Sequence, residues 1–117
     1  MIAGKRILLI EDEFLVSAML EDELAEMGAL VVGPAASLAE GLALARAGGF
    51  DLAVLDWNLD GESSEPIARA LQAAGVPFAI STGYGVVPKG YADCPVLAKP
   101  YDPRDLVAVL ASLLPPG

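Results

Sequence analysis

The chain has 117 residues, and its 16 Asp and Glu outnumber its 7 Lys and Arg, so the formal net charge is −9. This length predicts one domain with its own hydrophobic core. The acidic charge argues against binding to nucleic acid or to an anionic membrane surface, because both need clustered Lys and Arg. With no His and a single Cys, Cys94, the chain excludes His/Cys zinc sites, Ser-His-Asp triads and disulfide frameworks.

The apolar content fits a compact cytoplasmic protein. No apolar run reaches the roughly 18 residues that a membrane span needs, and the first residues lack the layout of a signal peptide. A hydrophobic fraction of 55% with 20% charged residues is that of a globular chain rather than a disordered one. The chemistry that remains uses oxygen groups: carboxylates, hydroxyls and a hard cation such as Mg²⁺.

Five short apolar runs recur along the chain and are predicted to be β-strands. Their hydrophobicity is continuous rather than alternating, which is typical of a parallel sheet covered on both faces. In chain order the runs are residues 7–10, 29–32, 52–55, 77–80 and 95–98.

Segments with helical period lie between the strands. The first, about residues 13–27, has one apolar stripe made of Val16, Leu20, Leu24 and Met27. The second begins with a capping box, Ser37 and Glu40, and ends at Gly48 and Gly49. The third spans about residues 64–74, with Pro66 in its first turn.

The last helix is predicted to begin at Asp102 and Pro103 and to stop at Pro115. Its inward stripe consists of Leu106, Val109, Leu110 and Leu113, and a second apolar stripe consists of Val107, Ala111 and Leu114. The second stripe has two readings: packing at the chain end, or the surface of a homodimer or partner complex.

Alternating strands and helices imply right-handed crossovers and a doubly wound parallel α/β sheet. Residues 82–93 break the pattern, because Gly83, Gly85, Pro88 and Gly90 make this segment poor helix material. We therefore expect a loop or one short turn there, and a fourth helix that is shortened or absent.

Polar residues follow four of the five predicted strands. They are Glu11 and Asp12 after the first, Asp56 after the third, Thr82 after the fourth and Lys99 after the fifth. The ligand site of an open α/β sheet lies at this carboxyl edge, so these side chains are expected to converge. Clustered carboxylates repel one another unless a cation sits among them, and Mg²⁺ suits such a set. Asp56, after the most buried strand, is the best placed nucleophile and could accept a phosphoryl group.

This set of residues, in this order, resembles the receiver domain of bacterial two-component response regulators. The resemblance implies a flavodoxin-like (βα)5 fold with sheet order 2-1-3-4-5 over residues 1–117, with no effector domain. It implies that Asp56 is the phosphoacceptor, that Glu11, Asp12, Asp56 and the main-chain carbonyl of Asn58 hold Mg²⁺, and that Thr82 and Lys99 bind the phosphoryl group. It also implies a cis peptide bond before Pro100.

The sequence departs from the usual receiver in several places: the interval from Thr82 to Lys99 is several residues shorter than usual, Asp60 stands where many members have proline, and the switch aromatic is missing. The family's switch aromatic lies three residues before the lysine, and this chain has Val96 there. Tyr84 or Tyr91 could take over that role, and Trp57, beside Asp56, could gate the site. The segments Thr82-Gly83-Tyr84 and Lys99-Pro100-Tyr101 are similar to an atypical group of single-domain receivers nicknamed FAT GUY.

The phenylalanines Phe14, Phe50 and Phe78 are expected in the core, and Cys94 is expected to be an inert apolar residue. Seven of the acids lie between residues 11 and 26, and no Lys or Arg occurs between Arg6 and Arg46. The acids of the first helix have two readings: a solvated face, or a docking surface for a partner of complementary charge.

The sequence therefore predicts a phosphorylation-dependent signalling switch. Because the chain has no His, the donor imidazole must come from a histidine kinase or a histidine phosphotransferase, and the output would be binding to an unidentified protein or onward phosphotransfer. Such a protein catalyses only its own phosphorylation and dephosphorylation. Three alternatives remain: a receiver excised from a larger hybrid kinase or regulator, a haloacid-dehalogenase-like phosphohydrolase, and an interaction module that is not phosphorylated.

Overall fold

The computed structural model describes residues 2–83, 89–91 and 93–114. Five parallel strands form its central sheet in the order β2-β1-β3-β6-β7, which is the predicted order 2-1-3-4-5. The strands are β1 (Arg6–Ile10), β2 (Leu30–Ala35), β3 (Leu52–Asp56), β6 (Phe78–Thr82) and β7 (Val96–Ala98). The predicted doubly wound α/β fold is confirmed.

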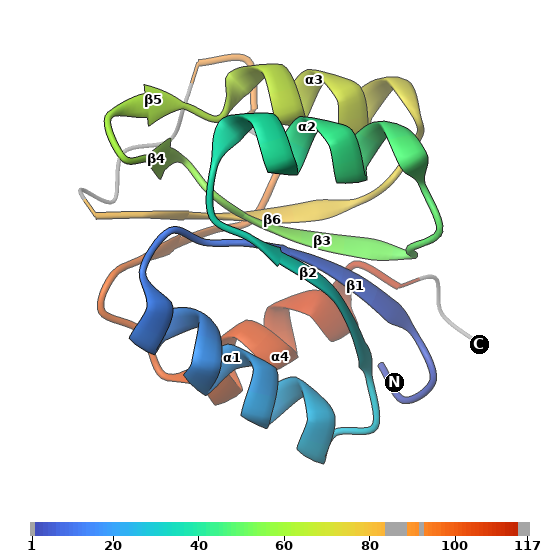
Figure 1. Cartoon of the computed structure of the whole chain (residues 1–117). Coiled ribbons are helices and arrows are strands. Elements are labelled where there is room, and N and C mark those ends of the chain that lie inside the picture. The colour runs from blue at the N-terminus through green and yellow to red at the C-terminus, as the bar shows by residue number, and fades with distance from the viewer. Residues whose placement is uncertain (1, 84–88, 92, 115–117) are drawn as a thin grey trace.

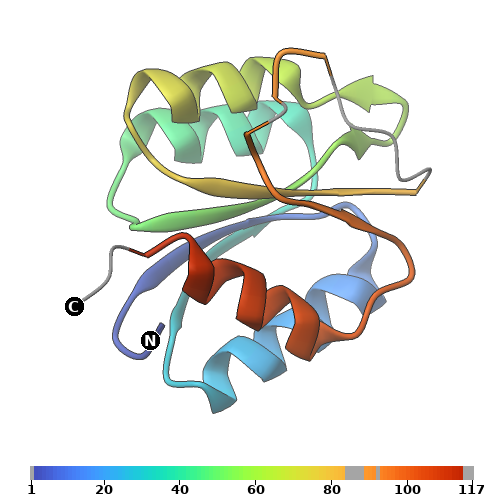
Figure 2. The same ribbon diagram turned by 180° about the vertical axis from the view of Figure 1, so that it is seen from behind.

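Helices of the described residues cover both faces of the sheet, as both views of the ribbon show (Figure 1, Figure 2). Helices α1 (Phe14–Glu26) and α4 (Pro103–Ser112) lie on one face, and α2 (Leu38–Ala47) and α3 (Glu65–Ala73) lie on the other. None of the helices in the described residues is long and apolar enough to cross a membrane.

Neighbouring strand residues point to opposite faces, which is why the strands read as continuous apolar runs. In β1, Ile7 and Leu9 belong to the core cluster with α1 and α4, whereas Leu8 and Ile10 belong to the cluster with α2 and α3. All five residues of β3 are buried. The carboxyl end of this central strand is therefore packed on both faces.

The helix starts follow the capping residues of the sequence. The Ser37 hydroxyl accepts a hydrogen bond from the Glu40 N–H at 3.2 Å, and the Asp102 carboxylate accepts one from the Arg104 N–H at 2.8 Å. Both side chains satisfy donors that the first helical turn leaves without partners. The predicted starts of α2 and α4 are confirmed.

No helix occurs among the described residues that connect β6 to β7, namely 83, 89–91 and 93–95. The Tyr91 side chain is buried there and packs edge-on against Phe78, with ring centroids 6.4 Å apart. An aromatic ring thus covers the apolar surface of β6 on this side of the sheet.

Two expectations about core residues are wrong. Phe14 is 80% exposed and Met27 is 43% exposed. Phe14 is the first residue of α1, ahead of the buried positions Ser17, Leu20 and Leu24, and it is not among the residues that pack against the core on this face of the sheet. Met27 is the C-cap residue of α1, beyond its last helical turn, and so leaves the buried stripe. Phe78 is buried and Phe50 is partly buried against the same core, as expected.

The structure adds a small hairpin that the sequence reading missed. Strands β4 (Asn58–Leu59) and β5 (Glu62–Ser63) pair antiparallel directly after β3. Asp60 and Gly61 form the turn with φ of 52° and 88°, and an Asp-Gly pair favours such positive φ values. This hairpin lies next to the carboxyl ends of the central strands.

Candidate functional site

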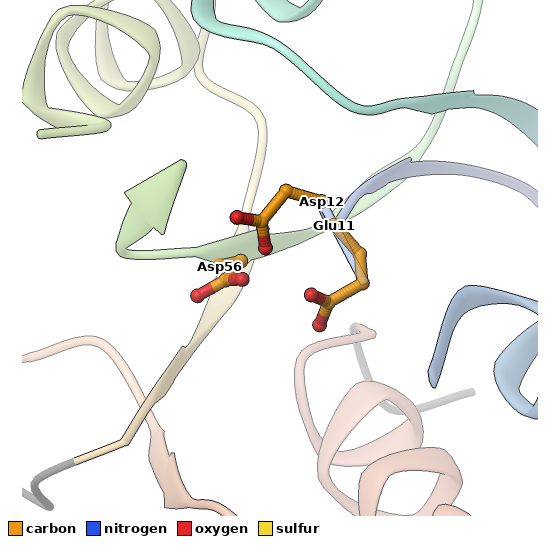
Figure 3. A group of neighbouring side chains, drawn as sticks. All are labelled: Glu11, Asp12 and Asp56. Carbon is orange, nitrogen blue, oxygen red and sulfur yellow. The ribbon is translucent and has the colours of Figure 1, made fainter. Parts of the chain in front are cut away.

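Three carboxylates gather at the carboxyl edge of β1 and β3. Glu11 and Asp12 follow β1, and Asp56 is the last residue of β3. One oxygen from each lies within 4.8 Å of the others, and Figure 3 shows the three side chains turned toward one another. Counted as whole residues, Glu11 and Asp56 are only 3% and 4% exposed. The predicted convergence of these three residues is thus present in the structure.

The ammonium group of Lys99 lies against this cluster. Its Nζ is 3.0 Å from Glu11 Oε1 and 3.1 Å from Asp56 Oδ2. A third and longer contact, 3.4 Å, reaches Glu13 Oε1. Lys99 comes directly after β7, which is joined to the cluster through β6 and β3. One cation therefore neutralises part of a negative cluster built from residues far apart in the sequence.

Burial and the neighbouring charges shift the pKa values of Asp56 and Lys99. Burial raises the pKa of Asp56 to about 8, with the neighbouring Glu11 and Asp12 adding to the rise and Lys99 acting against it. Burial acts against the charge of Lys99, but its bond to Glu11 and the charge of Asp56 outweigh burial, so the Lys99 pKa lies above its ordinary value. The negative charge of Asp56 is therefore disfavoured in the folded protein.

The turn after β3 is fixed by hydrogen bonds that sequence reasoning missed. The Asp60 N–H donates to Asp12 Oδ2 at 2.8 Å, and the Asn58 N–H donates to Asp56 Oδ1 at 3.4 Å. The Ser64 hydroxyl, fully buried, donates to the main-chain oxygen of Asp56. The Asp-Gly pair could have indicated this hairpin, but nothing in the sequence indicated the role of Ser64.

The remaining predicted site residues lie at the same edge. Thr82 is buried as the last residue of β6, and its main-chain oxygen accepts a hydrogen bond from the Lys99 N–H at 2.9 Å. The Lys99–Pro100 peptide bond is cis, as the resemblance implied. Val96 lies in β7 and is partly buried against the core.

Three aromatic residues were candidates for modulating the site. Tyr91 contacts Trp57 edge-on, with ring centroids 5.2 Å apart, and Trp57 packs against the core cluster of α2 and α3. These contacts give both rings a packing role, and gating by Trp57 stays a prediction. Tyr84 lies outside the described residues.

Two buried hydroxyl groups adjoin the site. Ser81 pairs with Asp56 in the sheet register, and neither its hydroxyl nor that of Tyr101 has a hydrogen-bond partner among the described residues. Burial raises the pKa of Tyr101 to about 12, and the charges of Glu11 and Asp56 add to this rise. The Tyr101 hydroxyl therefore stays protonated beside the carboxylates.

A groove of about 390 Å³ opens beside Lys99, between α1 and the segment after β7. It is lined by Glu13, Val16, Met19, Leu20, Gly83, Lys99, Pro100 and Tyr101. Next to it α1 exposes three large apolar side chains, Phe14, Leu15 and Met19, which are 80%, 76% and 51% exposed. We call these three residues the α1 apolar patch.

The donor set suits Mg²⁺. A single octahedral Mg²⁺ needs its oxygen ligands about 2.1 Å from the metal, hence no more than about 4.2 Å apart. The three carboxylate oxygens already lie within 4.8 Å of one another, so a small inward movement would bring them into range. Burial first, and then the neighbouring Glu11 and Asp12, raise the pKa of Asp56 despite Lys99, so a bound cation would stabilise its charged form. Glu11, Asp12 and Asp56 would hold the ion, and the Asn58 carbonyl, at the start of the hairpin, remains a predicted ligand.

No model of a known protein family matches the chain, and a search of curated proteins also found no match. Solved structures do match over nearly the whole chain. SdrG from Sphingomonas melonis Fr1 is 40% identical, with a TM-score of 0.84, and the alignment covers 95% of this chain and 97% of SdrG. A second SdrG structure, in a BeF3-activated conformation, is also 40% identical, with a TM-score of 0.77 and coverage of 98% and 100%.

Two further solved structures are response regulators. The receiver (REC) domain of PhyR from Erythrobacter litoralis is 25% identical, with a TM-score of 0.81 and coverage of 95% of this chain and 90% of that one. A response regulator from Burkholderia pseudomallei, with a phosphorylated aspartic acid, a calcium ion and citrate, is 27% identical, with a TM-score of 0.77. The alignment with it covers 92% of this chain and 66% of that chain.

Proposed function

Because the chain belongs to the receiver-domain family of two-component response regulators, which are phosphorylation-based signalling switches, we propose that Asp56 accepts a phosphoryl group in a Mg²⁺-dependent reaction. The observation that carries this proposal is the buried set of Glu11, Asp12 and Asp56 with Lys99 in contact with it. Residues 1–117 would act as one receiver domain, working in the cytoplasm.

The transfer requires Asp56 as a charged nucleophile. One of its carboxylate oxygens attacks phosphorus while the bond from phosphorus to the imidazole nitrogen of the donor breaks. The bonding electrons stay on that nitrogen, which then takes a proton from solvent. Bound Mg²⁺ supplies positive charge, which lowers the pKa of the carboxylates that hold it and neutralises phosphoryl oxygens.

The chain's own residues supply the rest of the stabilisation. Lys99 already contacts Asp56 Oδ2, so its ammonium is placed to bind an oxygen of a phosphoryl group attached there. Thr82, at the end of the adjacent strand β6, is the hydroxyl proposed to donate to a second oxygen. Little acid-base chemistry is needed, because the transition state of phosphoryl transfer is loose.

Phosphorylation is tested directly by mass. Incubation with acetyl phosphate and Mg²⁺ should add about 80 Da to the intact protein. The Asp56→Asn variant should gain no mass under the same conditions, whereas Asp51→Asn, which changes an exposed Asp before β3, should gain it as wild type does. Wild-type protein that gains no mass, or an Asp56→Asn variant that still does, would show that Asp56 is not the phosphoacceptor.

Mg²⁺ binding is tested through stability. Because Mg²⁺ would bind the folded carboxylate cluster, a concentration ten times Kd should raise the free energy of unfolding by about 1.4 kcal/mol. Asp12→Asn removes one ligand and should reduce this gain, whereas Glu26→Gln, at the far end of α1, should leave it unchanged. Thermal melting at a series of Mg²⁺ concentrations measures the effect, and an equal gain in Asp12→Asn and wild type would contradict the assignment of Asp12.

The phosphoryl donor is proposed to be the phosphohistidine of a kinase or phosphotransferase, since this chain has no His. The α1 apolar patch lies beside the site and exposes more apolar surface than solubility favours, which fits a protein contact. The acids of α1 near it would favour a donor with basic residues around its own apolar surface. Output through an unidentified protein or by onward phosphotransfer is part of the same proposal.

The last helix is the proposed surface of a second contact. Val107 is buried in the core, while Ala111 and Leu114 are partly buried. A groove of about 450 Å³ remains between α1 and α4, lined by residues that include Ile2, Met27, Val107 and Ala111. Packing accounts for Val107, and a homodimer through the rest of this helix stays a prediction.

A further inference from the structure

Glu13 is the outermost of the three carboxylates that contact Lys99. Its carboxylate is 62% exposed, whereas the side chains of Glu11 and Asp56 are 1% and 6% exposed. Sequence reasoning placed Glu13 among the acids of the first helix and gave it no part in the site. In the structure, Glu13 Oε1 instead lies 3.4 Å from Lys99 Nζ, so Glu13 forms an ion pair at the site.

The local structure does not explain this side chain as a helix cap. Glu13 is the N-cap residue of α1, but its side chain accepts no hydrogen bond from the first turn of the helix. Asp102, at the matching position of α4, does accept one. The Glu13 carboxylate therefore turns toward Lys99 rather than toward the helix, while its N–H donates to Glu11 Oε2 at 3.1 Å.

The position of Glu13 places a negative charge at the edge of the site. It lines the groove together with Lys99, Pro100 and Tyr101. A phosphoryl group that reaches Asp56 must share the Lys99 ammonium, and Glu13 is the exposed carboxylate that already occupies one side of it. An exposed ion pair of this kind adds little stability, but the negative charge of the Glu13 carboxylate still acts on an incoming ion.

We propose that Glu13 selects among phosphodonors by charge, disfavouring donors whose leaving group departs as an anion relative to donors whose leaving group departs neutral. The inference rests on the proposed phosphorylation of Asp56. The selective effect is on the leaving group: the Glu13 carboxylate repels negative charge that develops there in the transition state, and a leaving group that departs neutral escapes this repulsion.

Two small phosphodonors of similar size differ in the charge of their leaving groups, so a comparison of them separates the effect of charge from that of size. In acetyl phosphate, a bond from phosphorus to oxygen breaks, and acetate leaves as an anion with the electron pair. In phosphoramidate, a bond from phosphorus to nitrogen breaks, and the nitrogen, already protonated, leaves as neutral ammonia. Glu13 should therefore slow the first reaction more than the second.

The experiment compares wild type, Glu13→Gln, Glu13→Asp and Glu26→Gln with both donors, in Mg²⁺ and at low ionic strength, by the rate of mass gain. Glu13→Gln should react about threefold to tenfold faster with acetyl phosphate, as expected for one charge near another at the protein surface, and within about twofold of wild type with phosphoramidate. Glu13→Asp keeps the charge and Glu26→Gln removes a remote charge of the same helix, so both should keep the wild-type ratio of rates. Added salt should reduce the effect.

Other outcomes overturn the inference. If the ratio of the two rates is the same in Glu13→Gln and wild type, or if both rates rise equally, Glu13 does not select the donor. If Glu26→Gln changes the ratio as much as Glu13→Gln does, the effect is one of net charge. Wild-type protein that gains no mass from either donor would overturn the proposed phosphorylation itself, a result distinct from an unchanged ratio.

Discussion

Asp56→Asn is expected to stabilise the protein in the absence of divalent cations, and Lys99→Met is expected to destabilise it, although the two residues contact each other. Asp56 is a buried carboxylate beside Glu11 and Asp12, and its pKa of about 8 shows that its charge is unfavourable in the folded state. After allowance for solvent screening, we expect Asp56→Asn to raise the free energy of unfolding by about 1–3 kcal/mol at pH 8.

The gain should depend on pH in a definite direction. The Asp56 pKa is raised from 3.8 to about 8, so the folded protein holds this proton more tightly than the unfolded chain does. Wild-type stability contributed by this group is therefore fully present below about pH 4 and is lost as the pH rises to about 8. The difference between Asp56→Asn and wild type should vanish at the acidic end of this range and be largest at its upper end.

Lys99→Met should lower the free energy of unfolding by about 2–4 kcal/mol, because it leaves buried carboxylates without their counter-charge. The loss should be smaller in the Asp56→Asn background, where one of those charges is already gone. Urea unfolding of the two single variants and the double variant, in the presence of a chelator, measures all three values. A loss of stability in Asp56→Asn, or a gain in Lys99→Met, would contradict the electrostatic account of the site.

Leu15→Ala and Phe14→Ala are expected to slow phosphotransfer from a phosphohistidine protein without slowing phosphorylation by acetyl phosphate. Both side chains belong to the α1 apolar patch and are more than three-quarters exposed, so their removal should change stability little. If either anchors the donor protein, its loss should cost about 2 kcal/mol of transition-state binding, or roughly 30-fold in kcat/KM.

A matched control is available within the chain. Leu30, at the start of β2, is 53% exposed, and it lies at the amino end of the sheet, whereas the site lies at the carboxyl end. Leu30→Ala should transfer at the wild-type rate from the same donor, chosen as the fastest of a panel of phosphorylated histidine phosphotransferases tested with wild type. Equal rates for Leu15→Ala, Phe14→Ala and wild type would remove the patch from the donor interface.

Much of the fold follows from the sequence. The strands are continuous apolar runs because helices cover both faces of a parallel sheet, and Ser37 and Asp102 mark helix starts because their side chains cap them. The Gly- and Pro-rich segment after Thr82 predicted a shortened or absent helix because such residues do not sustain one, and the described residues of that segment contain no helix. These features depend on local chemistry and on burial, which sequence patterns record directly.

Which residues form the site also follows from the sequence, because the carboxyl ends of the strands in a parallel sheet share one edge. Glu11, Asp12, Asp56 and Lys99 could be chosen on this ground before their distances were known. The exposed position of Phe14 could not, since apolar character does not say whether the first residue of a helix reaches the core.

Tertiary structure alone decided how the charges of the site are shared. Glu13 is one acid in a run of three, and only the approach of the segment after β7 to the start of α1 joins it to Lys99. Contacts of this kind depend on the packing of elements more than 80 residues apart, and residue types in the sequence carry no record of the distance or direction between two side chains. The sequence by itself determined which groups reach the edge of the sheet, and the folded structure determined which of them touch.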